Sequence, residues 1–249
     1  MSESTPPAVF VDPLPSVGEC LELEREQSHY LSRVLRARAG DPIRVLDGAG
    51  SACLATVRQI DRRRVLLAIE STLDDEPLRE SPLAVRLAFG VLKSAKLEVV
   101  LQKATELGVR SFQPLEMSRT RERKRAAEQH ARWQRIVLEA VRQCDRRVIP
   151  PIHPPLPLDA LRLDLGERGL LFTTEPEAGD LRARLLDVVP HPGAVCLVFG
   201  AEGGLAEGET ASLVAAGFSP VRLGPRILRA ETAILAALSI VQHIWGDVH

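Results

Sequence analysis

The chain has 249 residues, of which 45% are hydrophobic and 26% charged, and its formal net charge is −1. These values are ordinary for a soluble globular protein, and the longest uncharged apolar stretch, residues 232–246, is too short to cross a bilayer. Residues 1–15 lack the basic start and apolar run of a secretory signal, so we expect a cytoplasmic protein. The four cysteines form no CxxC pair and the six histidines no HxxxH or HxxH pair, so we expect no metal site.

The first third of the chain is predicted to be a small β-rich domain. Short apolar segments that alternate with turn residues predict strands at residues 20–23, 42–46, 52–60 and 65–69. Residues 26–38 predict a helix with Tyr30, Leu31, Val34 and Leu35 on one face and His29, Arg33, Arg36 and Arg38 on the other. One helix and several short strands indicate a compact, barrel-like domain.

A domain boundary is predicted at residues 73–82, which are polar, acidic and interrupted by two prolines. It separates a first domain, residues 1–74, from a second, residues 81–249. In the second domain strands and helices alternate: strands are predicted at 85–92, 111–115, 169–173, 195–199 and 221–223, and helices at 96–107, 126–144 and 230–245. This alternation predicts a mostly parallel α/β sheet, in which ligands bind outside the carboxyl ends of the strands.

Positive charge is concentrated in residues 81–150, which carry 15 basic and 7 acidic side chains. The segments before and after this block are acidic on balance. A basic block inside a nearly neutral chain indicates a surface that binds phosphate groups.

The sequence CLVFGAEGGLAEGE, residues 196–209, places four glycines directly after an apolar strand. Glycines there let the backbone turn tightly and approach a ligand closely, although a plain glycine-rich turn before a helix would have the same pattern. The segment contains neither GxGxxG nor a Walker A lysine, so it predicts neither a dinucleotide site nor a P-loop.

The sequence RLGPRILRAETAILAAL, residues 222–238, places two arginines just before the last predicted helix. Glu231 and Thr232 are explained by a helix start, where acceptor side chains satisfy free backbone N–H groups. Arg226 and Arg229 are not, because the helix dipole disfavours positive charge at that end. They therefore indicate an anionic partner, either an RNA phosphate or a cofactor carboxylate.

Five blocks in this order resemble one family: HYLSRVLRARAGD, KLEVVLQKATELGV, RQCDRRVIP, LVFGAEGG and LGPRILRAET. The chain is similar, from Val9 to Gly246, to the 16S rRNA (uracil-N3)-methyltransferases of the knotted, SPOUT class. The most specific blocks are QKATELGV, residues 102–109, and LGPRILRAET, residues 223–232.

The resemblance implies a trefoil-knotted, mostly parallel sheet flanked by helices, preceded by a small PUA-like β-barrel domain that binds RNA. It implies S-adenosylmethionine as the cofactor, 16S rRNA in the small ribosomal subunit as the substrate, and a homodimer whose active sites are completed by the partner subunit. The cofactor residues that it implies are Thr173, Thr174, Phe199, Gly200, Glu202, Gly203, Leu223, Gly224, Ile227, Leu228, Ala230 and Thr232.

The chain departs from the family pattern at a few positions. Ala201 stands where the family has proline, Arg142 where it has glutamate and Val148 where it has arginine, and the loop at Ser118 and Arg119 lacks a glutamate. Except for Ala201, these departures lie in the middle region that we expect to face RNA.

Methylation of uracil N3 requires an unpaired base and loss of the N3 proton, which leaves negative charge on the two flanking carbonyl oxygens. Arg229 and Arg226 are predicted to stabilise that charge. Glu202 is the nearest candidate general base, but it equally suits a carboxylate that orients the loop. Predicted RNA contacts are Arg33, Arg36, Arg119 and Arg146.

Two other functions stay open from the sequence. One is ribose 2′-O-methylation of tRNA or rRNA by the same class of fold. The other is a non-catalytic RNA-binding or ribosome-assembly factor, which the departures at Ala201 and Arg142 would fit.

Overall fold

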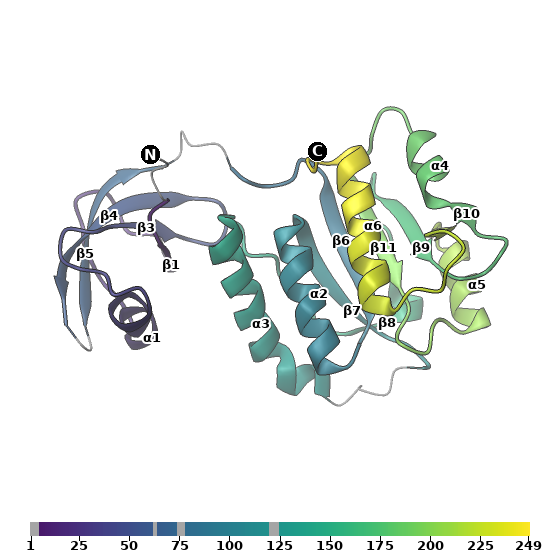
Figure 1. The fold of residues 1–249 in the computed structure, drawn as a ribbon, viewed down its shortest axis with the longest axis horizontal. Coiled ribbons are helices and arrows are strands. Elements are labelled where there is room, and N and C mark those ends of the chain that lie inside the picture. Colours follow the sequence, from purple (N-terminus) through teal and green to yellow (C-terminus); the bar gives the residue numbers. More distant parts are fainter. Residues whose placement is uncertain (1–4, 62–63, 74–77, 120–124) are drawn as a thin grey trace. The chain divides into compact units, whose positions relative to one another are not determined.

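The computed structural model describes residues 5–61, 64–73, 78–119 and 125–249 (Figure 1). The chain divides into two compact units, one of Met1–Glu80 with Val141–Ile149 and one of Ser81–Ala140 with Pro150–His249. Part of the predicted boundary, residues 74–77, lies outside the described residues.

The first unit contains a five-stranded sheet in the order β1-β3-β4-β5-β2. The strands are β1 (Ala8–Phe10), β2 (Cys20–Glu22), β3 (Pro42–Leu46), β4 (Ala52–Ile60) and β5 (Val65–Thr72). All pairs are antiparallel except β1 with β3. Two register shifts between β4 and β5 mark bulges, which bend a sheet. The sheet therefore curls around buried Val9, Leu31, Ile43 and Leu67, which confirms the predicted barrel-like domain.

The helix predicted at residues 26–38 is shorter and differently wound. It begins as α1 (Arg25–His29), continues as one π-helical turn, η1 (Tyr30–Val34), and is followed by Arg36 with a φ of 56°. In a π-helix the hydrogen bonds run from i to i+5, so residues three apart, such as Leu31 and Val34, no longer share a face. Leu31 is therefore fully buried while Val34 is 62% exposed, and the predicted single apolar face is wrong.

The second unit contains a seven-stranded sheet in the order β10-β12-β9-β11-β6-β7-β8, and every pairing in it is parallel. This confirms the predicted α/β class. The strands are β6 (Ala84–Gly90), β7 (Val109–Glu116), β8 (Leu156–Pro157), β9 (Arg168–Phe172), β10 (Gly179–Asp180), β11 (Ala194–Phe199) and β12 (Ser219–Arg222). The trefoil knot stays a prediction.

The helices are α2 (Ser94–Glu106), α3 (Arg125–Cys144), α4 (Leu181–Leu186), α5 (Glu207–Ala215) and α6 (Ala230–Trp245), with a short 3-10 turn, η2 (Leu158–Ala160). Helices α2 and α6 lie side by side over the sheet (Figure 1). Buried Gln242 connects α6 with the end of α2, because its Nε2 donates to the Leu107 carbonyl at 2.7 Å. Its Oε1 accepts from the hydroxyl of Ser81, just before β6, at 2.9 Å. The C-terminal ends of α2 and α6 are thereby held together.

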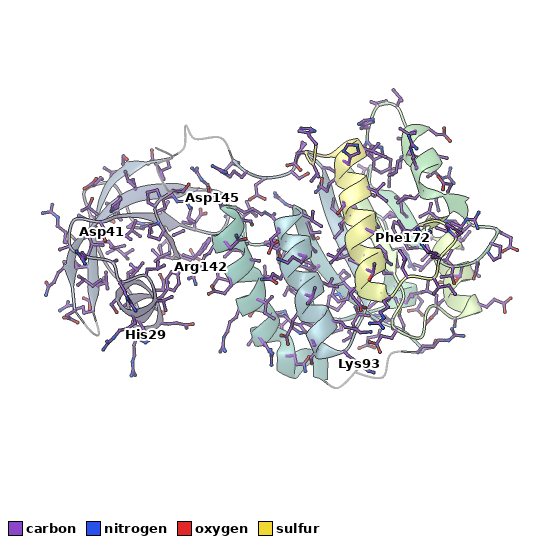
Figure 2. All side chains as sticks on the ribbon, in the orientation of Figure 1. His29, Asp41, Lys93, Arg142, Asp145 and Phe172 are labelled. Carbon is purple, nitrogen blue, oxygen red and sulfur yellow. The ribbon has the colours of Figure 1, made fainter. Side chains whose placement is uncertain are left out.

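Residues 141–149 lie in the first unit, although the sequence prediction placed them in the second domain. Asp145 forms an ion pair with Arg44 of β3, and the Ile149 N–H donates to the Gly48 carbonyl at 2.9 Å. Figure 2 shows Arg142 and Asp145 beside the strands of the first unit. The Arg142 guanidinium lies 4.7 Å from the centroid of the Tyr30 ring. These contacts are made to residues about a hundred positions away, so the local sequence does not reveal them.

Candidate functional site

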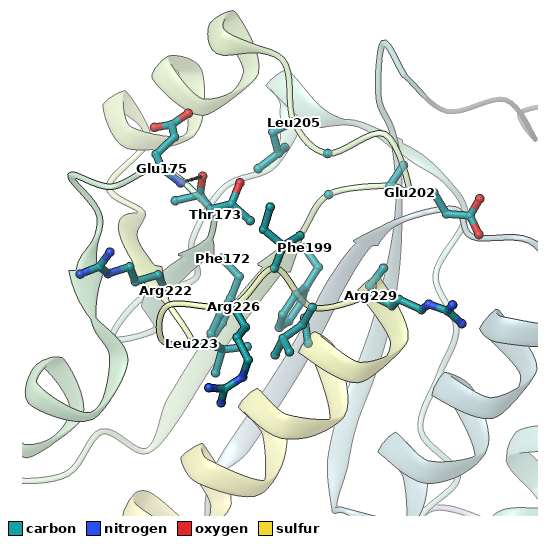
Figure 3. Close-up of a pocket in the computed structure, with 18 of the residues that line it drawn as sticks. Phe172, Thr173, Glu175, Phe199, Glu202, Leu205, Arg222, Leu223, Arg226 and Arg229 are labelled. Carbon is teal, nitrogen blue, oxygen red and sulfur yellow. Dashed lines mark hydrogen bonds between the residues drawn. The ribbon is translucent and has the colours of Figure 1, made fainter.

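Three neighbouring strands of the second sheet end at the same edge. Strand β9 ends at Phe172, β11 at Phe199 and β12 at Arg222, and the order in the sheet is β12-β9-β11. The rings of Phe172 and Phe199 stack with their centroids 4.3 Å apart (Figure 3). Because all three strands are parallel, the segments that follow them meet where ligands bind in α/β sheets.

These segments enclose a cavity of ≈ 750 Å³. Its lining includes both predicted catalytic arginines and all the predicted cofactor residues except one: Thr173, Thr174, Phe199, Gly200, Glu202, Gly203, Leu223, Gly224, Arg226, Ile227, Leu228, Arg229 and Ala230. The exception is Thr232, which lies exposed in the first turn of α6 and is not among the described residues of the lining. The structure thus brings together the two segments that the sequence singled out.

The glycine loop, residues 200–206, folds back closely on itself. A Cβ at Gly200 would lie 2.9 Å from the carbonyl carbon of Gly204, and Gly204 has a φ of 71°. The Gly204 N–H donates to the Ala201 carbonyl at 2.8 Å, and Ala201 itself is buried against Gly90 of β6. The loop therefore keeps a tight turn without the proline of the family pattern.

Arg119 contacts this loop from the end of the segment that follows β7. Its Nη1 donates to the carbonyls of Gly203 and Leu205, at 2.8 and 3.1 Å. The sequence predicted Arg119 as an RNA contact; the structure shows it bound to the loop that lines the cavity. Its neighbour Thr120 lies outside the described residues.

Glu209 of α5 also connects the glycine loop with the segment that follows β7. Its carboxylate accepts from the backbone N–H of Ser118 at 2.6 Å and from that of Ala206 at 2.8 Å. Burial raises the pKa of Glu209, but hydrogen bonds from the Ala206 and Ser118 backbones outweigh it and hold the pKa below its usual value. The glycine loop is thus bound by a cation at two of its carbonyls and by an anion at the Ala206 N–H.

Glu202, the predicted candidate base, is ion-paired. Lys96 Nζ lies 2.9 Å from its Oε1, and Lys93 Nζ lies 3.5 Å from its Oε2. The hydrogen bond from Lys96 and the charge of Lys93 lower the pKa of Glu202, and Glu202 in turn raises the pKa of Lys96. Figure 3 shows the carboxylate directed away from Phe172 and Phe199. A general base at neutral pH needs a pKa raised toward 7, so this environment disfavours that role.

Arg226 and Arg229 project from the loop between β12 and α6 (Figure 3). Both side chains are exposed, and within the part of the chain that the structure describes neither forms an ion pair. The cavity lining contains five basic residues, Lys96, Arg119, Arg222, Arg226 and Arg229, against two acidic ones, Glu175 and Glu202. The cavity is therefore electropositive and suits an anionic group.

The remaining predicted RNA contacts lie in the first unit and differ in exposure. Arg33 and Arg36 are exposed. Arg146 is buried, with 3% of its side chain exposed, and forms an ion pair with Glu80 at 2.6 Å. The position of Arg146 is that of a structural residue.

Sequence reasoning missed several residues of the lining: Lys96, Leu205, Arg222 and Ala233. Most adjoin a residue that was predicted. Lys96 does not, because it comes from α2, and nothing in its local pattern connects it with the glycine loop.

Two observations concern what the described residues lack. They contain no group of three or more histidine, cysteine, aspartate or glutamate side chains placed to hold a metal ion. Of the helices in that part of the chain, none is long and apolar enough to cross a membrane.

Two family models match this chain. A family model described as an RNA methyltransferase domain matches residues 79–242, and one described as an RNA methyltransferase PUA domain matches residues 23–70. A curated relative from Synechocystis, named ribosomal RNA small subunit methyltransferase E, is 36% identical over 93% of this chain and 75% of its own. The protein of that name from Bacillus subtilis is 32% identical over 88% of each chain.

Two solved structures match nearly the whole chain. The ribosomal RNA small subunit methyltransferase E of Neisseria gonorrhoeae, bound to S-adenosylmethionine, is 34% identical with a TM-score of 0.87, covering 98% of this chain and 100% of that one. A Legionella pneumophila protein in complex with the same cofactor is 31% identical with a TM-score of 0.88 and the same coverage.

Proposed function

This chain belongs to the RNA methyltransferase family, and we propose that it transfers a methyl group from S-adenosylmethionine to N3 of one uridine in 16S rRNA. The observation that carries the proposal is the cavity at the ends of β9, β11 and β12, which offers apolar and backbone groups to a cofactor and arginines to the anionic RNA. The relatives named ribosomal RNA small subunit methyltransferase E support the substrate, and the structure from Neisseria gonorrhoeae supports the cofactor.

The residues of the cavity fit this cofactor. A cavity of ≈ 750 Å³ is in the range of small-molecule sites, which combine apolar walls with a few polar groups. Phe172, Phe199, Leu223 and Ile227 supply apolar surface for a nucleoside base. Thr173 and the backbone of the glycine loop supply hydrogen-bonding groups. When bound, the cofactor supplies an electrophilic methyl group on a sulfonium centre.

The two arginines supply what the target base needs. Uracil N3 carries a proton at neutral pH and lies on the pairing edge, so the base must be flipped out of its stack. As the proton leaves, negative charge spreads to the flanking carbonyl oxygens. Arg226 and Arg229 present guanidinium groups that no described carboxylate neutralises, and donors aimed at developing charge stabilise it most in a preorganised site.

The proton itself is proposed to pass to water. Glu202 is bound to Lys96, and its lowered pKa makes it a weak base at neutral pH. A cluster of cations instead lowers the pKa of N3, because it favours the anionic form of the base. Glu202 then acts as a structural carboxylate of the loop.

The first unit, with exposed Arg33 and Arg36, is proposed to contact the rRNA, which its match to an RNA methyltransferase PUA domain supports. We also propose a homodimer in the cytoplasm, with a trefoil knot in the second unit and each site completed by the partner subunit. The family resemblance supports these points.

The test is methyl transfer to small ribosomal subunits that lack the modification, using labelled S-adenosylmethionine. Methylation at N3 blocks base pairing, so reverse transcription should stop at one uridine. Label on ribose without a stop would instead indicate 2′-O-methylation, and no label would indicate a non-catalytic binding factor.

Arg229→Ala tests the assignment of the arginine. We expect the rate to fall by about a hundredfold, as for the loss of one donor that stabilises transition-state charge. Arg182→Ala is the control, because Arg182 is exposed on α4 and lies outside the cavity lining. Equal rates for the two variants would remove Arg229 from the mechanism.

A further inference from the structure

Lys96 contacts two segments that form different walls of the cavity. It is the third residue of α2, and its Nζ lies 2.9 Å from Glu202 Oε1 in the glycine loop. The same Nζ lies 3.6 Å from Oε2 of Glu231, in the first turn of α6. One ammonium group therefore bridges the loop after β11 and the helix that follows β12.

The two carboxylates depend on this lysine to different degrees. Glu202 is also paired with Lys93, at 3.5 Å. Glu231 Oε2 is shielded from solvent and has no hydrogen-bond partner among the described residues, so the ammonium of Lys96 is its nearby compensating charge. An uncompensated buried charge is costly, and Lys96 thus holds the start of α6 as well as the loop.

We propose that Lys96 is a positioning residue for the methyl transfer: it ties the glycine loop to the start of α6 and fixes the spacing of the two walls between which the cofactor binds. The inference rests on the proposed function for the identity of the ligand. The geometry on which it depends, the bridge between Glu202 and Glu231, stands independently of that identity.

The first experiment measures S-adenosylmethionine binding to the full-length protein by calorimetry. Lys96→Met should weaken binding about fivefold, since a partly exposed ion pair makes only a modest contribution. Lys96→Arg should restore most of the affinity, because it keeps the cation. The matched control is Lys103→Met, which removes another lysine of α2, one paired with Glu106 at 2.9 Å on the same helix. It should leave binding unchanged.

The second experiment separates positioning from general destabilisation. Steady-state kinetics on small subunits should show a raised KM for S-adenosylmethionine in Lys96→Met, with kcat at saturating cofactor unchanged. If Lys96 acts through its two carboxylates, Lys96→Met should have no further effect in a Glu202→Gln, Glu231→Gln background. The thermal unfolding midpoint of each variant shows whether it is folded. If Lys96→Met does not fold, the two variants Lys96→Arg and Glu202→Gln are each measured in its place.

The outcomes distinguish this inference from the proposed function. If the unmodified protein does not bind S-adenosylmethionine, the proposed cofactor is wrong. If the protein binds it and Lys96→Met binds equally well, the positioning role is overturned. Additive effects of Lys96→Met and the carboxylate substitutions would overturn it too, because they would show that Lys96 acts by another route.

Discussion

Replacing Glu80 by glutamine tests whether Arg146 is a structural residue of the first unit. Glu80 Oε2 accepts hydrogen bonds from Arg146 Nε at 2.9 Å and from Nη2 at 2.6 Å. Its Oε1 accepts from the backbone N–H groups of Arg147 and Val148, at 3.2 and 3.1 Å. The pair is buried, with 3% of the Arg146 side chain and 10% of the Glu80 side chain exposed. Glu80→Gln keeps the shape and removes the charge.

The expected loss of stability is large. Removing one partner of a buried ion pair typically costs about 3–5 kcal/mol, because the other charge stays buried without it. Glutamine keeps part of the hydrogen bonding, so we expect a loss of about 3 kcal/mol in the free energy of unfolding. With a urea dependence of about 2 kcal/mol per molar, the midpoint of the first unit should fall by about 1.5 M.

Hydrogen exchange of the amides of β3, β4 and β5, measured against urea concentration, reports the first unit separately from the second. Glu22→Gln is the matched control in the same unit, since Glu22 pairs with Arg64 where both side chains are at least half exposed. Exposed pairs contribute little, so this variant should not shift the midpoint. Equal midpoints for Glu80→Gln and Glu22→Gln would refute the structural role of Arg146 and would favour the predicted RNA contact.

Three further predictions concern the cavity. Arg119→Met should weaken S-adenosylmethionine binding about tenfold, measured by calorimetry, because a charged donor to two loop carbonyls is lost; unchanged affinity would contradict its positioning of the loop. Gly200→Ala should abolish cofactor binding, since its Cβ would lie 2.9 Å from the Gly204 carbonyl carbon, and retained binding would show that the loop can shift. The lowered pKa of Glu202 means that its ion pair with Lys96 is complete above the ordinary value of 4.5 and is lost as the pH falls through the lowered pKa. The profiles of kcat/KM against pH for Glu202→Gln and the unmodified protein should therefore coincide in shape near neutral pH, and an ionisation there that disappears in Glu202→Gln would restore Glu202 as the base.

The parts of the site that the sequence predicts are those in which chain neighbours are also neighbours in space. Apolar runs followed by glycine, as at Phe199 and Gly200, mark strand ends, and in a parallel sheet strand ends share an edge. The loop at Arg226 and Arg229 could be recognised because its charges conflict with a helix start. The bridge from Lys96 could not, because it depends on α2 and α6 lying side by side, which no local pattern specifies.

The basic block at residues 81–150 shows how far a charge count predicts a binding surface. Several of its arginines are bound within the fold: Arg86 pairs with Glu167, Arg132 with Glu98 and Arg146 with Glu80, while Arg119 donates to loop carbonyls. Two of these partners, Glu167 and Glu80, lie outside the block, so its net charge overstates the charge that it presents to a ligand.

The cavity shows the opposite case, because three of its five basic residues come from a segment whose net charge is negative. Arg222, Arg226 and Arg229 come from residues 151–249, which carry 7 basic and 12 acidic side chains and are acidic on balance. All three belong to the end of β12 and the loop that follows it, and the strand order β12-β9-β11 places this loop beside the ends of β9 and β11, at the cavity. Of the acidic side chains of that segment, Glu175 and Glu202 line the cavity with them, and Glu202 is bound to Lys96. The charge of the cavity is thus set by the short segments that line it and not by the net charge of the surrounding sequence, and substitutions at Arg226 and Arg229 should lower catalysis more than substitution of an arginine of the basic block outside the cavity lining, such as Arg132.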